Sequence, residues 1–219
     1  MNLSELLVES LKRGASDVHV VSGQAPIFRI NTELVPVDYP VIGQEDSAAL
    51  VKEMVGNRRY AQFLRRRDLD FSWKVPGAGR FRVNAHFQRE TVAIAFRAIP
   101  SSVPPLETLS LPDIVRTFTD LPRGLVLVTG ETGAGKSTTL ASMIDAINHK
   151  YGYHVLTLED PVEYELRPDK CIIEQREVGA DVPSFASGLK HVLRQDPDII
   201  LVGEMRDLET TSAAITAAE

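Results

Sequence analysis

Residues 124–137 read GLVLVTGETGAGKS, and this stretch decides the fold. Its first half, 124–128, is a short apolar run of the kind expected for a strand covered on both faces. Its second half fits G-x-x-x-x-G-K-[ST], and residues 136–148 continue with apolar side chains at helical spacing. A glycine-rich turn between a strand and a helix is the context of a phosphate-binding P-loop, so the sequence predicts one here.

The glycines of this loop let backbone amides turn inward around phosphates, and the helix N-terminus adds a partial positive charge. Lys136 is expected to reach the β- and γ-phosphates of a nucleotide, and Ser137 to bind Mg²⁺. The alternative is a glycine-rich turn with a lysine nearby, which the flanking strand and helix disfavour. The predicted nucleotide-binding residues are Gly130, Glu131, Thr132, Gly133, Ala134, Gly135, Lys136, Ser137 and Thr138.

Residues 196–207 read DPDIILVGEMRD, in which four apolar residues predict a buried strand. The end of this strand brings Gly203 and Glu204 to the sheet edge where P-loop enzymes hold metal and water. Glu204 is the best candidate for a general base, and the alternative is that it caps the next helix. A plain Walker B motif has an acid directly after the apolar run. Gly203 stands there instead, which leaves metal binding to other carboxylates.

Between these two motifs, residues 158–164 read LEDPVEY and end a predicted strand with Glu159, Asp160 and Glu163. Hard cations prefer such carboxylate oxygens, so Glu159 and Glu163, with Ser137, are the predicted Mg²⁺ ligands. The alternative is that these acids are solvated side chains at a strand end.

After residue 106 the pattern alternates between strand and helix. Strands are predicted at 154–158, 171–174 and 199–202, and a helix at 184–194. This alternation is typical of an α/β fold with a largely parallel sheet.

The first hundred residues predict a small α+β unit, with helices at 3–13, 45–55 and 58–64 and strands at 17–21, 27–31, 80–88 and 91–99. Residues 100–105 (PSSVPP) cannot form a continuous helix or an inner strand, so they are the predicted linker. The predicted domains are therefore 1–99, the linker 100–105, and the P-loop domain 106–219.

Composition narrows the possible functions. Hydrophobic residues make up 43% and charged residues 25%, as in ordinary globular proteins, and the formal charge of −6 disfavours a protein built to grip nucleic acid. Cys171 is the only cysteine, which excludes a disulfide framework and a cysteine-based zinc site within this sequence. No apolar run approaches the ~20 residues of a membrane span, so we expect a cytoplasmic protein linked to any membrane through a partner.

The three motifs in this order, with DPDIILVGEMRD the most specific, resemble the secretion and pilus ATPase superfamily. They are most similar to the type IV pilus retraction (twitching motility, PilT-type) ATPases. GASDVHV at 14–20 and GRFRVNAHFQRE at 79–90 resemble the family's PAS-like N-terminal domain. The resemblance therefore covers nearly the whole chain.

This resemblance implies a RecA-like P-loop NTPase core that hydrolyses ATP with Mg²⁺, a hexameric ring, and an inner-membrane pilus platform protein as partner. It also implies that LEDPVEY is the family's Asp box, that Glu204 is the catalytic glutamate, and that Arg82 and Arg97 reach the nucleotide. Arg80 shares the polar side of its strand with Arg82, so the choice of Arg82 rests on the resemblance. The alternative for each arginine is a solvated strand residue.

The same motifs are compatible with other functions. Within the family the chain could be a pilus assembly or type II secretion ATPase. Outside it, a nucleotide-gated scaffold or a nucleic-acid translocase would also carry a P-loop. The resemblance further implies a longer protein, with a His box after Glu219, so we expect this sequence to be a fragment.

Overall fold

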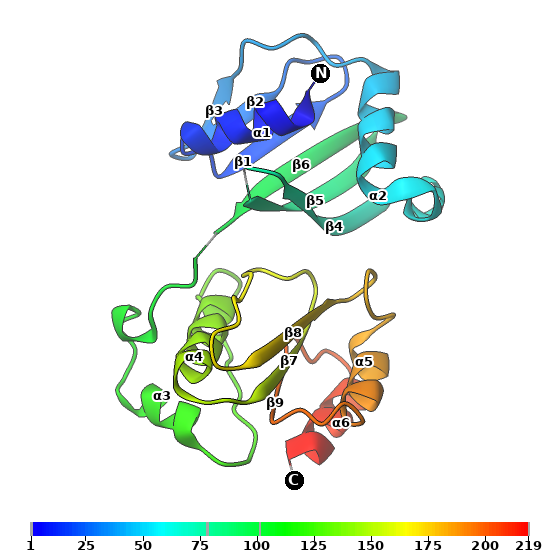
Figure 1. The fold of residues 1–219 in the computed structure, drawn as a ribbon. Helices are drawn as coiled ribbons and strands as arrows, with labels where there is room; N and C mark the ends of the chain where they lie inside the picture. Colours follow the sequence, from blue (N-terminus) through cyan, green and yellow to red (C-terminus); the bar gives the residue numbers. More distant parts are fainter. Residues whose placement is uncertain (1, 78, 101, 219) are drawn as a thin grey trace. The chain divides into compact units, whose positions relative to one another are not determined.

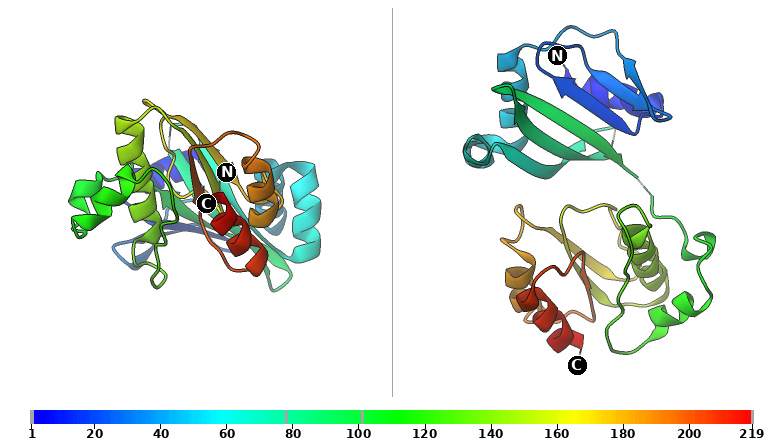
Figure 2. Two further views of the ribbon diagram at one scale, coloured as in Figure 1. Left: turned by 90° about the horizontal axis from the view of Figure 1, so that it is seen from below. Right: turned by 180° about the vertical axis from the view of Figure 1, so that it is seen from behind.

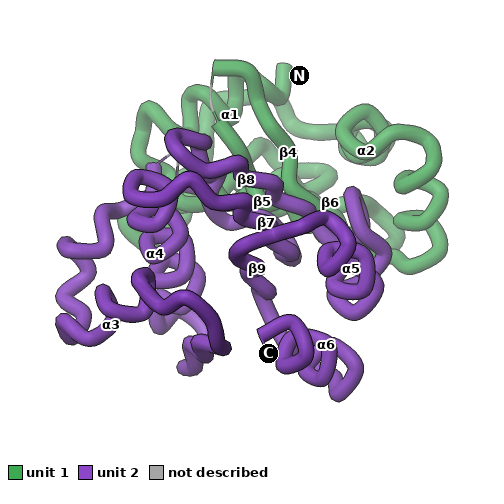
Figure 3. Tube along the Cα trace, turned by 60° about the horizontal axis from the view of Figure 1, so that its bottom comes forward, with its two compact units in different colours: residues 1–99 green, residues 100–219 purple. Residues whose placement is uncertain are grey.

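The computed structural model describes residues 2–77, 79–100 and 102–218, and it divides into two compact units, Met1–Ile99 (unit 1) and Pro100–Glu219 (unit 2) (Figure 3). Ser101 in the predicted linker, and Met1 and Glu219 at the ends of the predicted domains, lie outside the described residues. The second half of the linker is anchored within unit 2, because Ser142 Oγ donates a hydrogen bond of 2.7 Å to the Pro104 carbonyl.

Unit 1 is built on a six-stranded antiparallel sheet with the order β3-β2-β1-β6-β5-β4 (Figure 1). Its strands are β1 (Asp17–Val21), β2 (Ile27–Ile30), β3 (Glu33–Pro36), β4 (Asp68–Val75), β5 (Gly79–Gln88) and β6 (Thr91–Ile99). The sequence predicted four of these strands. It missed β3, which is short and ends in proline, and β4, although Leu69, Phe71, Trp73 and Val75 stand at every second position, as in a half-buried strand.

Two helices, α1 (Leu3–Lys12) and α2 (Gln44–Arg66), bury their apolar sides on one face of this sheet. Leu6 and Leu7 of α1, and Val51 and Phe63 of α2, share one core with the strands. The sequence predicted two separate helices where α2 stands. The structure confirms this break, because Gly56 separates the two helical parts of α2 with a φ of 70° and a ψ of 172°, which are not helical.

The opposite face of the unit 1 sheet is polar, and we call it the polar face. Cross-strand partners in an antiparallel sheet put their side chains on the same face. The observed register therefore assigns to this face Asp17, His19, Arg29, Ser72, Arg82, Asn84, His86 and Arg97.

Unit 2 has a parallel sheet of β8 (Ile172–Glu177), β7 (His154–Glu159) and β9 (Ile199–Val202), in that order across the sheet. Helix α4 (Lys136–Lys150) covers one face, and α5 (Phe185–Val192) and α6 (Leu208–Ala218) cover the other (Figures 1 and 2). Val155 of β7 packs toward α4, and Leu156 and Leu158 pack toward α5 and α6. This three-layer order confirms the predicted α/β fold with parallel strands.

The segment before the P-loop carries only short helical turns, at Leu106–Thr108, Ile114–Thr117 (α3) and Phe118–Asp120. The strand predicted at 124–128 is not formed, so this prediction is wrong: Leu125 is 45% and Leu127 60% exposed. An apolar run becomes a buried strand only where a neighbour takes its backbone hydrogen bonds and helices cover it. Within the described residues, 124–128 has neither.

Among the described residues, no helix combines the length and the apolar character needed to cross a membrane.

Candidate nucleotide site

The predicted P-loop forms a turn that leads directly into α4. Gly130, Gly133 and Gly135 have φ angles of 156°, 85° and 86°, values that favour glycine over residues with side chains. Gly135 is the N-cap of α4 and supplies no side chain to the first turn. The N–H groups at this helix start, together with the helix dipole, are therefore available to bind an anion such as phosphate.

Lys136 is the first residue of α4, and its side chain folds back across the loop. Its Nζ donates hydrogen bonds to the carbonyls of Gly130 at 2.9 Å and Glu131 at 2.8 Å. These two carbonyl oxygens accept from two of the three N–H donors of the ammonium group. Ser137 follows in the first turn of the helix and is an exposed residue.

The structure links the start of α4 to the LEDPVEY segment, because the Thr138 Oγ1 and Tyr164 Oη atoms are 3.0 Å apart. Glu159 is the last residue of β7, and its Oε1 accepts hydrogen bonds from Thr157 Oγ1 at 2.6 Å and from Gln175 Nε2 at 3.0 Å. Two of the sequence motifs therefore meet at one edge of unit 2.

Burial raises the pKa of the Glu159 carboxyl above its usual value, and the charge of nearby Glu163 acts in the same direction. The hydrogen bonds from Thr157 and Gln175 lower this pKa without cancelling the effect of burial. A carboxylate held in such surroundings gains from a nearby cation. The oxygens of Glu159, Glu163 and Ser137 have the hard-ligand chemistry that Mg²⁺ prefers, so the residues present fit this ion.

Gly203 explains why the strand β9 departs from a plain Walker B motif. Its N–H donates to the Leu158 carbonyl at 2.8 Å, so the ends of β9 and β7 lie close together. A Cβ at position 203 would be 3.2 Å from the Leu158 carbonyl oxygen and 3.4 Å from Glu159 Cα. A larger residue does not fit without a backbone shift, and the acid stands one position later, at Glu204.

Gly203→Ala is therefore expected to lower the free energy of unfolding by about 1–3 kcal/mol, as overpacking against backbone usually does. Urea unfolding of the purified protein measures this change. Gly152→Ala is the matched control, because its Cβ would meet only the Lys170 carbonyl at an ordinary 3.7 Å. Equal stability of the two variants would contradict the close approach of β9 and β7.

Glu204 forms an ion pair with Arg206, whose Nη2 is 2.8 Å from Glu204 Oε2. It does not cap the following helix. That role belongs to Asp207, whose carboxylate accepts hydrogen bonds from Thr210 N at 2.7 Å and Thr210 Oγ1 at 2.8 Å. The backbone hydrogen bond from Thr210 lowers the pKa of Asp207.

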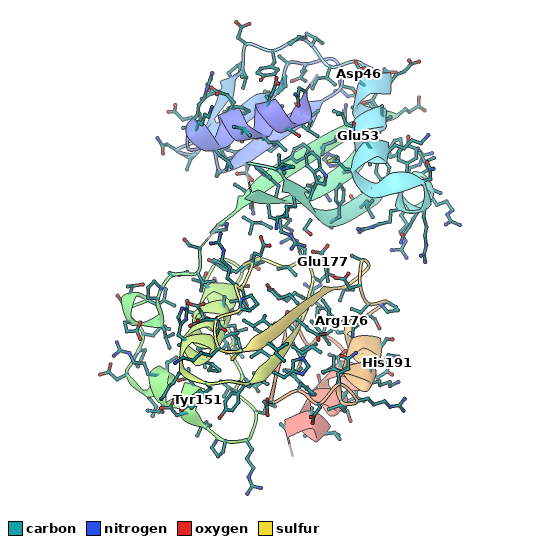
Figure 4. The ribbon with its side chains drawn as sticks, in the orientation of Figure 1. Asp46, Glu53, Tyr151, Arg176, Glu177 and His191 are labelled. Atoms are coloured by element: carbon teal, nitrogen blue, oxygen red, sulfur yellow. The ribbon has the colours of Figure 1, made fainter. Side chains whose placement is uncertain are left out.

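Sequence reasoning missed the residues that hold LEDPVEY in place. Glu177 lies at the end of β8 (Figure 4). The register places it opposite Glu159, and it is only 3% exposed. Its Oε2 accepts a hydrogen bond of 3.4 Å from the Val162 amide. The predicted strand stopped at 174, whereas β8 continues to Glu177. Polar residues at the carboxyl end of a parallel strand are placed to face a site.

The two predicted arginines lie in unit 1, on neighbouring strands and directly opposite each other: Arg82 on β5 and Arg97 on β6. Both are on the polar face. Arg97 Nε donates a 2.9 Å hydrogen bond to Asp17 Oδ1. Arg80, the alternative to Arg82, donates through Nη2 to Ser72 Oγ at 2.6 Å.

A glycine loop that opens a helix, beside carboxylates at the ends of parallel strands, defines a protein of the P-loop class. The chain belongs to the type II/IV secretion system protein family, whose model matches residues 2–219.

The chain is also similar to individual proteins of known name or structure. The type IV pilus retraction ATPase PilT of Pseudomonas aeruginosa is 45% identical over 219 residues, which cover 100% of this chain and 64% of that protein. A twitching motility protein of Neisseria gonorrhoeae is 43% identical over 194 residues, covering 89% of this chain and 52% of that protein. A crystal structure of the pilus retraction motor PilT with bound ADP matches 100% of this chain and 64% of that one, with a TM-score of 0.94 and 44% identity. The chain spans less than two thirds of the length of each.

Proposed function

We propose that the protein is an ATP-hydrolysing motor that drives type IV pilus retraction. The observation that carries this proposal is the match of the whole chain, unit 1 as well as unit 2, to a retraction motor solved with bound ADP. A P-loop domain alone would be compatible with many ATPases. The accompanying N-terminal unit is what favours this family of motors over the others.

We also propose the fold class of each unit and the form of the assembly. Unit 2 is the RecA-like core, supported by parallel strands between α4 on one face and α5 and α6 on the other. Unit 1 is the PAS-like domain, supported by an antiparallel sheet with helices on one face. The motor acts as a hexameric ring in the cytoplasm and meets the inner membrane through the pilus platform protein.

In the proposed mechanism, the P-loop amides and Lys136 bind the phosphates of ATP and orient the γ-phosphate. Ser137, Glu159 and Glu163 would hold Mg²⁺, which when bound would supply positive charge that offsets the negative charge of the phosphates. Glu204 accepts a proton from the attacking water, whose oxygen bonds to the γ-phosphorus as the bond to the β-phosphate oxygen breaks.

Arg82 and Arg97 neutralise the charge that grows on the γ-phosphate in the transition state. Because both arginines belong to unit 1, their proposed role would couple hydrolysis to movement of unit 1. Such coupling is what a motor requires.

The test uses the full-length protein and its host. We expect Mg²⁺-dependent ATP hydrolysis that EDTA abolishes and DNA leaves unchanged, and we expect a gene-deletion strain to keep its pili but lose twitching. Loss of the pili themselves would favour an assembly or secretion ATPase. Stimulation by DNA would favour a translocase, and ATP binding without turnover would favour a nucleotide-gated scaffold.

A further inference from the structure

One row of cross-strand partners runs over the polar face of unit 1. The register places Arg29 opposite Asp17, Asp17 opposite Arg97, and Arg97 opposite Arg82. Direct partners in an antiparallel sheet have Cβ atoms only about 4.5–5.5 Å apart, so their charges interact. The row therefore contains three arginines around a single carboxylate, that of Asp17.

Asp17 is the best-packed polar group of this row, with its side chain 12% exposed. Its Oδ1 accepts the hydrogen bond from Arg97 Nε at 2.9 Å, and its Oδ2 accepts one from Ser16 Oγ at 2.8 Å. Arg29 Nε is 3.9 Å from Oδ2. Burial alone would raise the pKa of Asp17, but the hydrogen bonds from Ser16 and Arg97 outweigh it and hold the pKa below its usual value.

The two arginines beside Asp17 use their guanidinium groups differently. Arg29 also donates a hydrogen bond through Nη1 to the Thr32 carbonyl at 2.9 Å. Its guanidinium group is therefore held by Asp17 and by Thr32. The Arg97 side chain is 70% exposed and is held through Nε. Its two terminal nitrogens make no hydrogen bond or ion pair within the described residues. The two terminal nitrogens of a guanidinium group lie in one plane and can bind a phosphate with two parallel hydrogen bonds.

Arg82 stands on the other side of Arg97, and like charges directly opposite each other in a sheet are destabilising. The carboxylate of Asp17 offsets this repulsion and keeps the Arg97 guanidinium beside the sheet. Without Asp17, Arg97 would gain rotamer freedom and move away from Arg82.

We propose that Asp17 is a positioning residue, which holds Arg97 through Nε so that its terminal nitrogens are presented to a phosphate group of the nucleotide. This assignment rests on the proposed ATPase function. Asp17 itself touches no reacting atom. Asp17 acts by ordering the Arg97 side chain, whose charge stabilises the transition state. Loss of Asp17 is therefore expected to affect turnover more than nucleotide affinity.

The experiment measures kcat and KM for ATP with full-length Asp17→Ala, Asp17→Asn, Arg97→Ala and Asp17→Ala/Arg97→Ala proteins. Asp17→Ala should lower kcat about 10- to 100-fold, the range expected for a hydrogen bond to a charged group, and change KM less than about threefold. Asp17→Asn keeps an acceptor for Nε and should recover part of the loss. In the double variant, kcat should equal that of Arg97→Ala, because Asp17 acts only through Arg97.

Arg29→Ala is the matched control, since it removes the other arginine from the same carboxylate without touching the Arg97 hydrogen bond. It should lower the unfolding temperature and leave kcat unchanged. Thermal unfolding of every variant separates loss of stability from loss of turnover. If Asp17→Ala does not fold, Asp17→Asn carries the same comparison with a smaller expected loss.

The assignment is overturned if Asp17→Ala has the wild-type kcat, if Arg97→Ala does, or if the two losses multiply in the double variant. A failure of the proposed function is distinguished from these outcomes by the wild-type protein. Wild-type turnover no faster than that of Lys136→Ala would overturn the ATPase function and the assignment together.

Discussion

Replacement of Lys136 by alanine is expected to abolish ATP turnover in the full-length protein, with a loss of at least about 100-fold. Lys136 Nζ lies across the P-loop on the carbonyls of Gly130 and Glu131, so it is placed to exchange these oxygens for phosphate oxygens. Its loss leaves only backbone amides and the helix dipole to bind the phosphates, so ATP affinity should fall as well.

Phosphate release and binding of a fluorescent ATP analogue measure the two effects. The matched control is Lys150→Ala at the other end of α4, where the exposed ammonium pairs with Asp120 at 2.6 Å. Surface ion pairs of this kind contribute little, so this variant should bind and hydrolyse ATP normally. Unimpaired turnover in Lys136→Ala would contradict the assignment of the nucleotide site to this loop.

Glu204→Gln is expected to keep ATP bound while lowering kcat by about 10²- to 10⁴-fold, the usual contribution of a general base. The amide has nearly the shape of the carboxylate but cannot accept a proton from water at neutral pH. Because Asp207, and not Glu204, caps α6, the substitution should leave the fold intact. The expected signature is a stable ATP complex that forms at the normal affinity and turns over very slowly.

Single-turnover measurements with radiolabelled ATP test this expectation, because they separate the chemical step from product release. Glu209→Gln is the matched control, since Glu209 is an exposed acid of α6 paired with Lys190. It should hydrolyse ATP at the wild-type rate. Normal hydrolysis by Glu204→Gln would show that another group takes the proton.

The local parts of the structure could be predicted from the sequence. The spacing of glycines around Lys136 and the apolar periodicity after it predicted a loop and a helix, and α4 begins at Lys136. The alternation in residues 80–88 predicted a strand with one buried and one polar side, as β5 shows. In both cases the information lies within a few neighbouring residues, because helix and strand periodicities place side chains on defined faces.

Apolar character alone was not sufficient to predict which segments form strands. The run at 124–128 looked as strand-like as the one at 199–202, yet only the second pairs with β7. Pairing depends on which edge is available in space, and a single segment carries no information about that.

By itself, the sequence determined which candidate groups the chain carries and where: the glycine-rich loop with Lys136, the acids of LEDPVEY, and Glu204 after an apolar strand. These depend on residue type and short spacing. The tertiary structure alone decided that Asp17 meets Arg97, which is 80 positions away, and that Gly203 lies too close to Leu158 for a side chain. Both depend on strand order and register, which the packing of a whole core sets, because a shift of one residue would turn every side chain of the strand to the other face.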